Sequence, residues 1–322
     1  MAITPIGTNT VTAISRRLIL PEIADNVYKS NPFFFRANAA HRKSVQGGTQ
    51  IEQPLMYTNM TSYGWYSGFD QLNTAPSDTV QNAVFMWKQA YVNVSVDGLT
   101  MIRVSSPLAI ANFIATQFAQ AQMQMADLLG QGMWSDSVTN VKAIDGILGA
   151  IDNGTINASY GGIARGSNAW WNAQIDSTTT VMTLAALQAL YGSTTVGGQH
   201  PTIIASNQHQ YNNYWALNTS FMQYPRQPVG SDENLAQAGF QNLLFNNTPW
   251  FVDSHVPTTG TQGFVFFINE NFLEFVVASM VDFYLEDFQT PVDQDAMVSK
   301  LLWAGDLTFS NVQLSGKFTA LT

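Results

Sequence analysis

The longest regular pattern of apolar positions lies in SSPLAIANFIATQFAQAQMQMADLLGQG, residues 105–132. Ser106 is the expected N-cap, Pro107 suits the first helical position, and Gly130 and Gly132 are expected to end the helix. Asp127 is its only charge, and its glutamines exclude a membrane span. The pattern therefore predicts a rod of roughly 35 Å whose outer face is polar but uncharged. Its apolar residues recur every three or four positions and predict one stripe: Ile110, Ile114, Phe118, Ala121, Met125 and Leu128.

Residues 45–97 show alternation typical of strands. TQIEQPLMYT and AYVNVSV flank a turn-rich middle, SYGWYSGFDQLNTAPSD, and three valines of the second run alternate with Asn93 and Ser95. This pattern predicts a long two-stranded hairpin. Because isolated two-stranded ribbons are marginal in water, we expect it to pack on another surface.

The remainder mixes helix and strand signals, so we predict the α+β class without an internal repeat. A helix is expected at Thr183–Tyr191 and a buried strand at PTIIAS, residues 201–206. Residues 1–44 carry no long periodic pattern and predict an arm with a short helix around Pro21–Tyr28. The last third predicts strands in GFVFFIN, FLEFVVAS, MVSKLLWAGDLTFSN and VQLSGKFTAL, with Val312, Leu314 and Phe318 on one face.

Charge is scarce and unevenly placed. Charged residues make up 11% of the 322 residues, against about 25% in an ordinary soluble protein, while apolar residues make up 46%. The net charge of −9 divides into +4 for residues 1–43 and −13 for the rest. An acidic body of this kind disfavours specific DNA or RNA recognition, and a low-charge surface is typical of a subunit covered by neighbours. The basic residues of the arm are Arg16, Arg17, Lys29, Arg36, Arg42 and Lys43.

The stretch YGGIARGSNAWW, residues 160–171, has the composition of a ligand loop. It lacks the spacing and the lysine of a phosphate-binding loop, and LSGKFT near the C-terminus matches such a loop no better. The alternative interpretation is that its glycines permit tight turns while Trp170 and Trp171 pack in a core or contact.

Other candidate chemistry is incomplete. There is no cysteine, no GxSxG elbow and no HExxH, so no thiolate site or hydrolase signature exists. Asp253–His255 and the pair His200 and His209 could supply metal ligands, but no carboxylate cluster accompanies them. SDENL, residues 231–235, is better explained as a helix cap than as a glycosidase pair. We therefore predict no catalytic, cofactor or metal residue, although reaction of Lys88 with a neighbour's amide or carboxylate stays open.

The order of these segments resembles the tailed-bacteriophage major capsid proteins of the Hong Kong 97 fold. The succession runs through DGILGAIDNG, YGGIARGSNAWW, PTIIASNQHQYNNYWAL, AGFQNLLFNNTPWFVDSHVP and GFVFFINENFLEFVV to DQDAMVSKLLWAGDLTFSN. It covers the chain from about residue 45 to the C-terminus. The colinearity carries the resemblance, because no single motif is decisive.

The resemblance implies a division of the chain and a role for its parts. YGGIARGSNAWW would join the spine region to the axial domain without any ligand, and residues 106–130 would be the spine helix. The implied parts are residues 1–44 as N-terminal arm, 45–97 as extended loop (a β-hairpin), 98–144 as peripheral domain with the spine helix, 145–255 as axial domain, and 256–322 as peripheral strands returning to the axial domain.

The implied function is a coat protein that forms hexamers and pentamers of an icosahedral head. Its location would be the virion capsid, around double-stranded DNA bound without sequence specificity and with no membrane. The implied partners are a portal protein, a decoration or cement protein, and a separate scaffolding protein, since no built-in scaffold fits before the hairpin. Expected inter-subunit contacts are Arg16, Arg17, Arg36, Arg42 and Lys43 of the arm, and Tyr63, Trp65, Tyr66 and Phe69 of the hairpin tip.

Two other classes stay open. An encapsulin has the same fold and would enclose an enzyme cargo. A carbohydrate-binding or glycoside-cleaving β protein would explain the tryptophans and tyrosines, but it gives no reason for the long uncharged helix.

Overall fold

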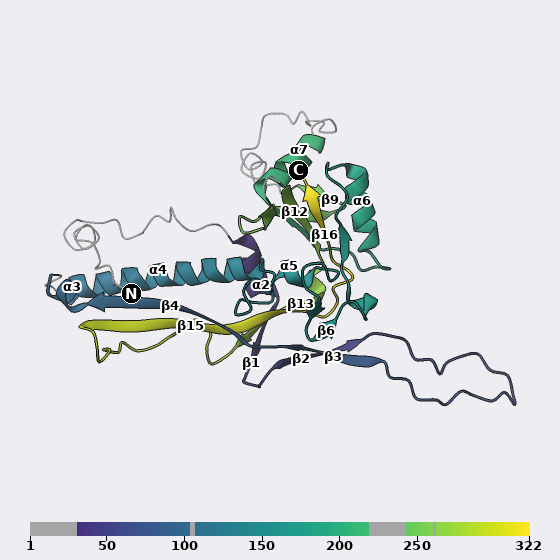
Figure 1. The fold of residues 1–322 in the computed structure, drawn as a ribbon, viewed down its shortest axis with the longest axis horizontal. Coiled ribbons are helices and arrows are strands. Elements are labelled where there is room, and N and C mark those ends of the chain that lie inside the picture. Colours follow the sequence, from purple (N-terminus) through teal and green to yellow (C-terminus); the bar gives the residue numbers. More distant parts are fainter. Residues whose placement is uncertain (1–30, 104–106, 219–242, 260–261) are drawn as a thin grey trace, which may run out of the picture.

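The structure is a computed structural model that describes residues 31–103, 107–218, 243–259 and 262–322. It is α+β and has three visible parts: a long lobe, a compact lobe and a projecting hairpin (Figure 1). None of its helices within the described residues combines the length and the apolar character needed to cross a membrane. The predicted arm helix at residues 21–28 and the SDENL segment lie outside these residues.

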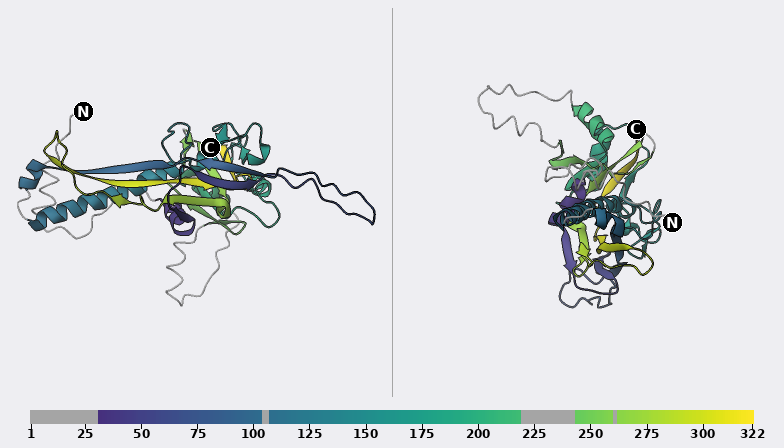
Figure 2. Two further views of the ribbon diagram at one scale, coloured as in Figure 1. Left: turned by 90° about the horizontal axis from the view of Figure 1, so that it is seen from below. Right: turned by 90° about the vertical axis from the view of Figure 1, so that its left-hand side faces the viewer.

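The long lobe is one helix laid along two long strands. Helix α4 (Pro107–Met133) runs beside β4 and β15, which pair antiparallel with Val92 opposite Leu301 (Figures 1 and 2). Helix α3 (Gly98–Arg103) follows β4. Helix α2 (Pro32–Ala40), which the sequence did not predict, buries Phe33 and Phe34 against this lobe. The five strands of the sheet are β1 (Arg42–Val45), β4 (Lys88–Asp97), β13 (Leu273–Ala278), β14 (Tyr284–Leu285) and β15 (Ala296–Phe309).

The compact lobe is a mixed sheet that carries helices on one face. Helix α6 (Leu184–Ser193), capped by the Thr183 hydroxyl, and α7 (Gln208–Asn218) pack on it. The helix predicted at 183–191 and the strand predicted at 201–206 are confirmed, whereas α7 had no periodic signal. The strands are β7 (Gln174–Asp176), β8 (Ile203–Ser206), β9 (Leu244–Phe245), β10 (Thr248–Val252), β11 (Thr258–Thr259), β12 (Gln262–Ile268) and β16 (Gly316–Leu321).

Strand β12 joins two hydrophobic cores. Its residues Val265 and Phe267 belong to the core beneath α6 and α7, while Phe266 and Ile268 belong to the larger core that reaches α4 and the long lobe. Successive side chains of a strand point to opposite faces, so a strand between two cores is apolar at every position. The continuous run GFVFFIN is therefore explained by burial on both faces.

The helix prediction needs two corrections. Helix α4 continues through Gly130 and Gly132 to Met133. These glycines provide space instead of a stop, since a methyl group on Gly130 would lie 2.7 Å from the Asn31 amide and one on Gly132 would lie 3.3 Å from Ile144. The buried stripe runs through Ala121, Met125, Leu129 and Met133, whereas Leu128 is exposed. The predicted cap at residue 106 lies outside the described residues.

The hairpin prediction is right about its first strand and wrong about its second. Strand β2 (Ile51–Met56) pairs with β3 (Val80–Phe85), a strand that the sequence analysis missed, so the ribbon spans residues 51–85. The alternating run AYVNVSV belongs to β4, which pairs with β15 and turns Val94 and Val96 inward. Burial of these valines in the long lobe therefore decides the pairing of β4, and closeness along the chain to β2 does not.

Three of the four strands predicted in the last third are confirmed, and the fourth forms only in the second half of its run, without the shared face. Strand β16 begins only at Gly316, and Val312 precedes it in a turn. Val312 lies in the larger core and Phe318 in the core beneath α6 and α7. A turn between the two residues breaks the alternation on which the prediction depended.

We expect Gly130→Ala to lower the melting temperature of the chain. Alanine is favoured over glycine inside a helix by about 1 kcal/mol, but here the methyl group would collide with Asn31, whose amide donates to Ala126 O at 2.9 Å. Gly192→Ala in α6 is the matched control, because its methyl group meets nothing within 4 Å. Thermal unfolding of both variants tests this, and equal stabilisation by both would contradict it.

Candidate functional site

The projecting end of the hairpin carries four exposed aromatic side chains. Tyr63, Trp65, Tyr66 and Phe69 are 81%, 105%, 69% and 108% exposed. Residues 44–87 contain no lysine or arginine and only Glu52, Asp70 and Asp78 as charges. The tip is thus an apolar, weakly acidic surface, and large aromatics of this kind are typical of interaction sites.

Side-chain hydrogen bonds hold the two legs of the hairpin together beyond its ladder. The Tyr57 hydroxyl donates to Asp78 O at 3.0 Å, and the Thr61 amide donates to the Ser77 hydroxyl at 3.0 Å. At the tip the Ser67 amide donates to the Asp70 carboxylate at 2.8 Å. The legs therefore stay paired although regular strands end at Met56 and Val80.

The described cations of the arm have carboxylate partners in the same chain. Arg36 makes two hydrogen bonds to Glu270, of 2.5 and 2.8 Å, and these bonds raise the pKa of Arg36 despite partial burial. Arg42 pairs with Asp282, and Lys43 lies 3.0 Å from Glu274. These pairs fasten α2 and β1 to η2 (Glu270–Phe272), to β13 and to the loop that follows β13. Contacts of these residues with another subunit stay a prediction, and Arg16 and Arg17 lie outside the described residues.

The YGGIARGSNAWW stretch is a structural turn. Strands β5 (Ser159–Tyr160) and β6 (Ile163–Ala164) form a small hairpin around Gly161 and Gly162, whose φ angles of +56° and +74° favour glycine. Helix η1 (Ala169–Trp171) follows, and the Trp171 indole donates to Tyr160 O at 2.9 Å. The Arg165 side chain is fully buried, so its guanidinium is closed to a ligand in solution.

A buried ionic group holds this turn in place. The Arg165 guanidinium donates to the carbonyls of Gly149 and Ala150 at 3.0 and 2.6 Å and lies 3.8 Å from Asp152. Lys317 Nζ lies 3.3 Å from Asp152 Oδ1. Burial lowers the pKa of Lys317 to about 8. Burial alone would raise the pKa of Asp152, but the Asn157 amide and the Lys317 charge lower it further than burial raises it.

His255 and Lys88 make contacts within the fold, whereas His209 is exposed. His255 Nε2 lies 2.9 Å from Asp127 Oδ1, and its Nδ1 lies 3.5 Å from Asp253 Oδ1. No group of three possible metal ligands occurs within residues 31–103, 107–218, 243–259 and 262–322. Lys88 donates to Val141 O at 2.7 Å and lies 3.5 Å from Asp145, which makes it a poor candidate for reaction with a neighbour.

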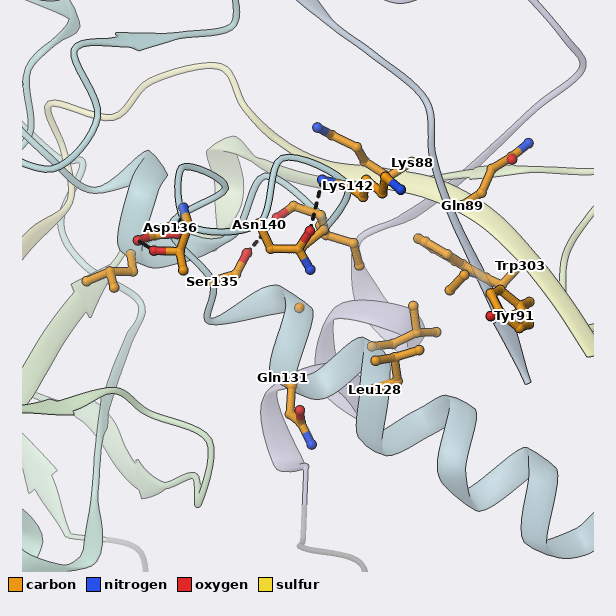
Figure 3. A pocket seen from close by; sticks show the side chains of 17 residues that line it. Lys88, Gln89, Tyr91, Leu128, Gln131, Ser135, Asp136, Asn140, Lys142 and Trp303 are labelled. Atoms are coloured by element: carbon orange, nitrogen blue, oxygen red, sulfur yellow. Dashed lines mark hydrogen bonds between the residues drawn. The ribbon is translucent and has the colours of Figure 1, made fainter. Parts of the chain in front are cut away.

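A pocket of about 530 Å³ lies between the end of α4, the following loop and the β4–β15 pair (Figure 3). Ala90, Leu129 and Trp303 contribute apolar lining. Asp136 is its only carboxylate, and that carboxylate accepts hydrogen bonds from Val138 and Thr139. Lys88 and Lys142 also line the pocket, and Lys88 donates a hydrogen bond to Val141 O.

Sequence reasoning found the exposed aromatics but missed the buried ionic group. Asp152 lies in DGILGAIDNG and Lys317 in LSGKFT, 165 positions later, and neither segment indicates that the two charges meet. The glycines beside Arg165 and Lys317 suggested phosphate-binding loops instead of a buried ion pair.

The comparisons with known proteins show the fold. The sequence matches no family model and no curated protein. Among solved structures, the cyanophage A-1(L) capsid is similar with a TM-score of 0.71 and 14% identity, over 98% of this chain and 100% of that one. The capsid of a native GTA particle has a TM-score of 0.62 and 12% identity, over 95% and 96% of the two chains. The SrpI encapsulin of Synechococcus elongatus PCC 7942 has a TM-score of 0.62 and 8% identity, over 99% and 96%.

The lowered pKa of Lys317 predicts a pH dependence of stability. Between about pH 8 and pH 10.5 the unfolded chain holds a proton on this lysine that the folded chain has lost. Stability rises with pH wherever the unfolded state binds more protons, so this lysine adds stability as pH rises through that window. Denaturant unfolding should show an upward slope that Lys317→Met flattens, by up to about 3 kcal/mol across the window. Parallel pH profiles for the two proteins would contradict the prediction.

Proposed function

We propose that this chain, which has the Hong Kong 97 fold shared by phage capsid proteins and an encapsulin, is the major capsid protein of a tailed phage. Copies of it would form hexamers and pentamers of an icosahedral head and would catalyse no reaction. The aromatic tip of the hairpin carries the proposal, because these side chains lie on a ribbon that extends away from both cores (Figure 1).

The tip explains why a single copy is incomplete. Only the base of the hairpin is buried in a core, and a two-stranded ribbon by itself is marginal in water. Trp65 and Phe69 leave essentially their whole side chains in solvent, which is costly unless another surface covers them. A second copy of the chain is the partner that a homomeric shell supplies.

The position of the hairpin favours rings. A projecting element that docks on the body of the next copy makes a heterologous contact, and such contacts close into rings when the rotation closes. The uncharged outer face of α4 and the scarcity of charge overall suit close contact, because buried unpaired charges are expensive. Under this proposal β2 and β3 form the extended loop, α4 is the spine helix, the long lobe is the peripheral domain and the compact lobe is the axial domain.

The other parts of the proposal concern partners and location. We propose a location in the virion capsid, a separate scaffolding protein, a portal protein, a decoration or cement protein, and packaged double-stranded DNA bound without sequence specificity. The net charge of −13 outside the arm supports the last point, since an acidic lining repels nucleic acid. Only the basic arm, including Arg16 and Arg17, could attract an acidic partner.

The encapsulin alternative has a specific observation in its favour, namely the end-to-end likeness to the SrpI encapsulin. An encapsulin and a phage capsid differ in what the shell encloses, so the contents of purified particles distinguish the two functions. Shells that contain a co-purified enzyme would favour an encapsulin.

We expect the purified chain to form closed icosahedral shells when it is produced with its scaffolding partner. Produced alone, it should give aberrant spirals or unassembled subunits. Analytical ultracentrifugation and electron microscopy measure both outcomes. Monomers under every condition would contradict the capsid proposal, whereas uniform shells from the chain alone would contradict only the need for a scaffold.

Trp65→Ala should weaken the shell and leave the subunit fold unchanged. Aromatic anchors at interfaces contribute about 2–4 kcal/mol each, while an exposed residue changes subunit stability by less than about 0.5 kcal/mol. Denaturant-induced disassembly of shells measures the loss of shell stability, and melting of unassembled chains measures the change in subunit stability. The control is Trp250→Ala, which removes a fully buried side chain and should destabilise the subunit itself. Equal losses for Trp65→Ala in both assays would show an ordinary core residue.

A further inference from the structure

The base of the hairpin rests on the segment Tyr160–Trp171, here called the pedestal. The Val84 amide of β3 donates to Gly161 O at 2.8 Å, so the ladder of the hairpin continues into the pedestal. The Phe85 and Tyr160 rings meet edge to face with centroids 5.1 Å apart. The hairpin is therefore attached to the pedestal by a backbone hydrogen bond and by an aromatic contact.

Gly161 allows the closest approach between the two parts. A methyl group on Gly161 would lie 2.9 Å from the Phe85 ring and 3.0 Å from the Ala83 methyl group, both on β3. Its neighbour Gly162 also has a positive φ, yet a methyl group there would meet nothing within 4 Å. Both glycines have a positive φ angle, but only at Gly161 would a Cβ atom collide with a neighbouring residue.

Trp170 contacts the hairpin on the side of β2, whereas Gly161 contacts β3. The Trp170 ring stacks on Tyr57, just beyond β2, with centroids 5.6 Å apart and planes inclined by 29°. Its indole N–H donates to Asn168 Oδ1 at 3.2 Å, and its ring packs against Trp171. The stack is the outermost ring contact between hairpin and pedestal among the described residues.

The pedestal itself is rigidly anchored. Trp171 is buried in the larger core, and Arg165 is tied to the carbonyls of Gly149 and Ala150 and to Asp152. The guanidinium Nη2 makes both carbonyl hydrogen bonds, while its Nε and Nη1 have no hydrogen-bond partner, so the anchor depends on Nη2 and on the charge of Asp152. The pedestal can therefore transmit the orientation of the core to the hairpin.

We propose that the pedestal sets the direction of the hairpin, with Gly161 and Trp170 as its positioning residues. Each leg has about ten residues beyond Tyr57 and Thr79, which at about 3.3 Å per residue places the tip roughly 33 Å beyond the stack. A tilt of about 10° at the base then moves the tip by about 6 Å. Packed contacts do not tolerate such a displacement, so under the proposed function the pedestal fixes where the tip meets the next copy and how strongly the shell curves.

The absence of cysteine from the chain allows a direct measurement. Ser67→Cys at the tip and Ser177→Cys on the compact lobe, both at exposed positions, take one spin label each. Labelled chains diluted into an excess of unlabelled chains report only the distance within one copy by double electron–electron resonance. The unsubstituted pedestal should give one narrow distribution.

Gly161→Ala should move the tip by several ångströms or broaden the distribution, whereas Gly162→Ala should reproduce the parent distribution. The second variant carries the same positive-φ penalty and so controls for general backbone strain. Should Gly161→Ala fail to fold, Trp170→Ala gives the test: it should broaden the distribution, and Trp170→Phe should restore a narrow one. Parent-like distributions for both Gly161→Ala and Trp170→Ala would overturn the inference.

Particle diameters add a second readout that depends on the proposed function. Electron microscopy should show uniform shells for the parent and for Gly162→Ala, and a wider spread of diameters for Trp170→Ala. A parent that forms no shells would refute the capsid proposal, while the distance measurement would still decide the role of the pedestal. Uniform, parent-sized shells from Trp170→Ala would count against control of curvature.

Discussion

The buried ion pairs and hydrogen bonds of the Asp152 carboxylate hold together the region where the hairpin meets the two lobes. This carboxylate accepts the amides of Gly154, Ile156 and Asn157 at 2.9, 2.8 and 3.1 Å and faces the buried cations of Arg165 and Lys317. A buried charge is tolerated only when it is paired and hydrogen-bonded. The group joins the end of α5 (Ile147–Ala150), the turn that carries the hairpin, and the C-terminal strand β16. Loss of this one carboxylate would leave two cations unpaired inside the protein.

The two lobes and the hairpin obtain their stability in different ways. Each lobe has a core, and β12 contributes alternate side chains to both. The hairpin has a core only at its base, where Leu55, Ala83 and Phe85 are buried, and its outer half is held by hydrogen bonds between its legs. Its direction is therefore determined at the base, and its tip is free to be buried by another molecule.

The same residues that suggested a ligand loop serve this arrangement. Gly161 allows the backbone of the turn to approach β3, and Arg165 neutralises a buried carboxylate. Trp171 packs in the larger core, whereas Trp170 stacks on the hairpin. Composition alone does not distinguish a loop that must approach a phosphate from a loop that must approach a neighbouring strand. In both cases glycine is used because a Cβ atom would not fit.

The sequence by itself determined the features that depend on neighbouring residues: the helix that begins at Pro107, the helix capped by Thr183, the strands in the last third, and an aromatic tip between two strand segments. Tertiary structure decided the features that depend on distant partners. The run AYVNVSV alternates equally well for a hairpin and for a pair with β15, and burial under α4 selected β15. Gly130 has the same sequence signal as a helix stop, but α4 continues through it, and the close approach of Asn31 leaves no room there for a Cβ atom. Asp152 finds Lys317 across 165 positions because the fold encloses both, and no local pattern records which buried charges will meet.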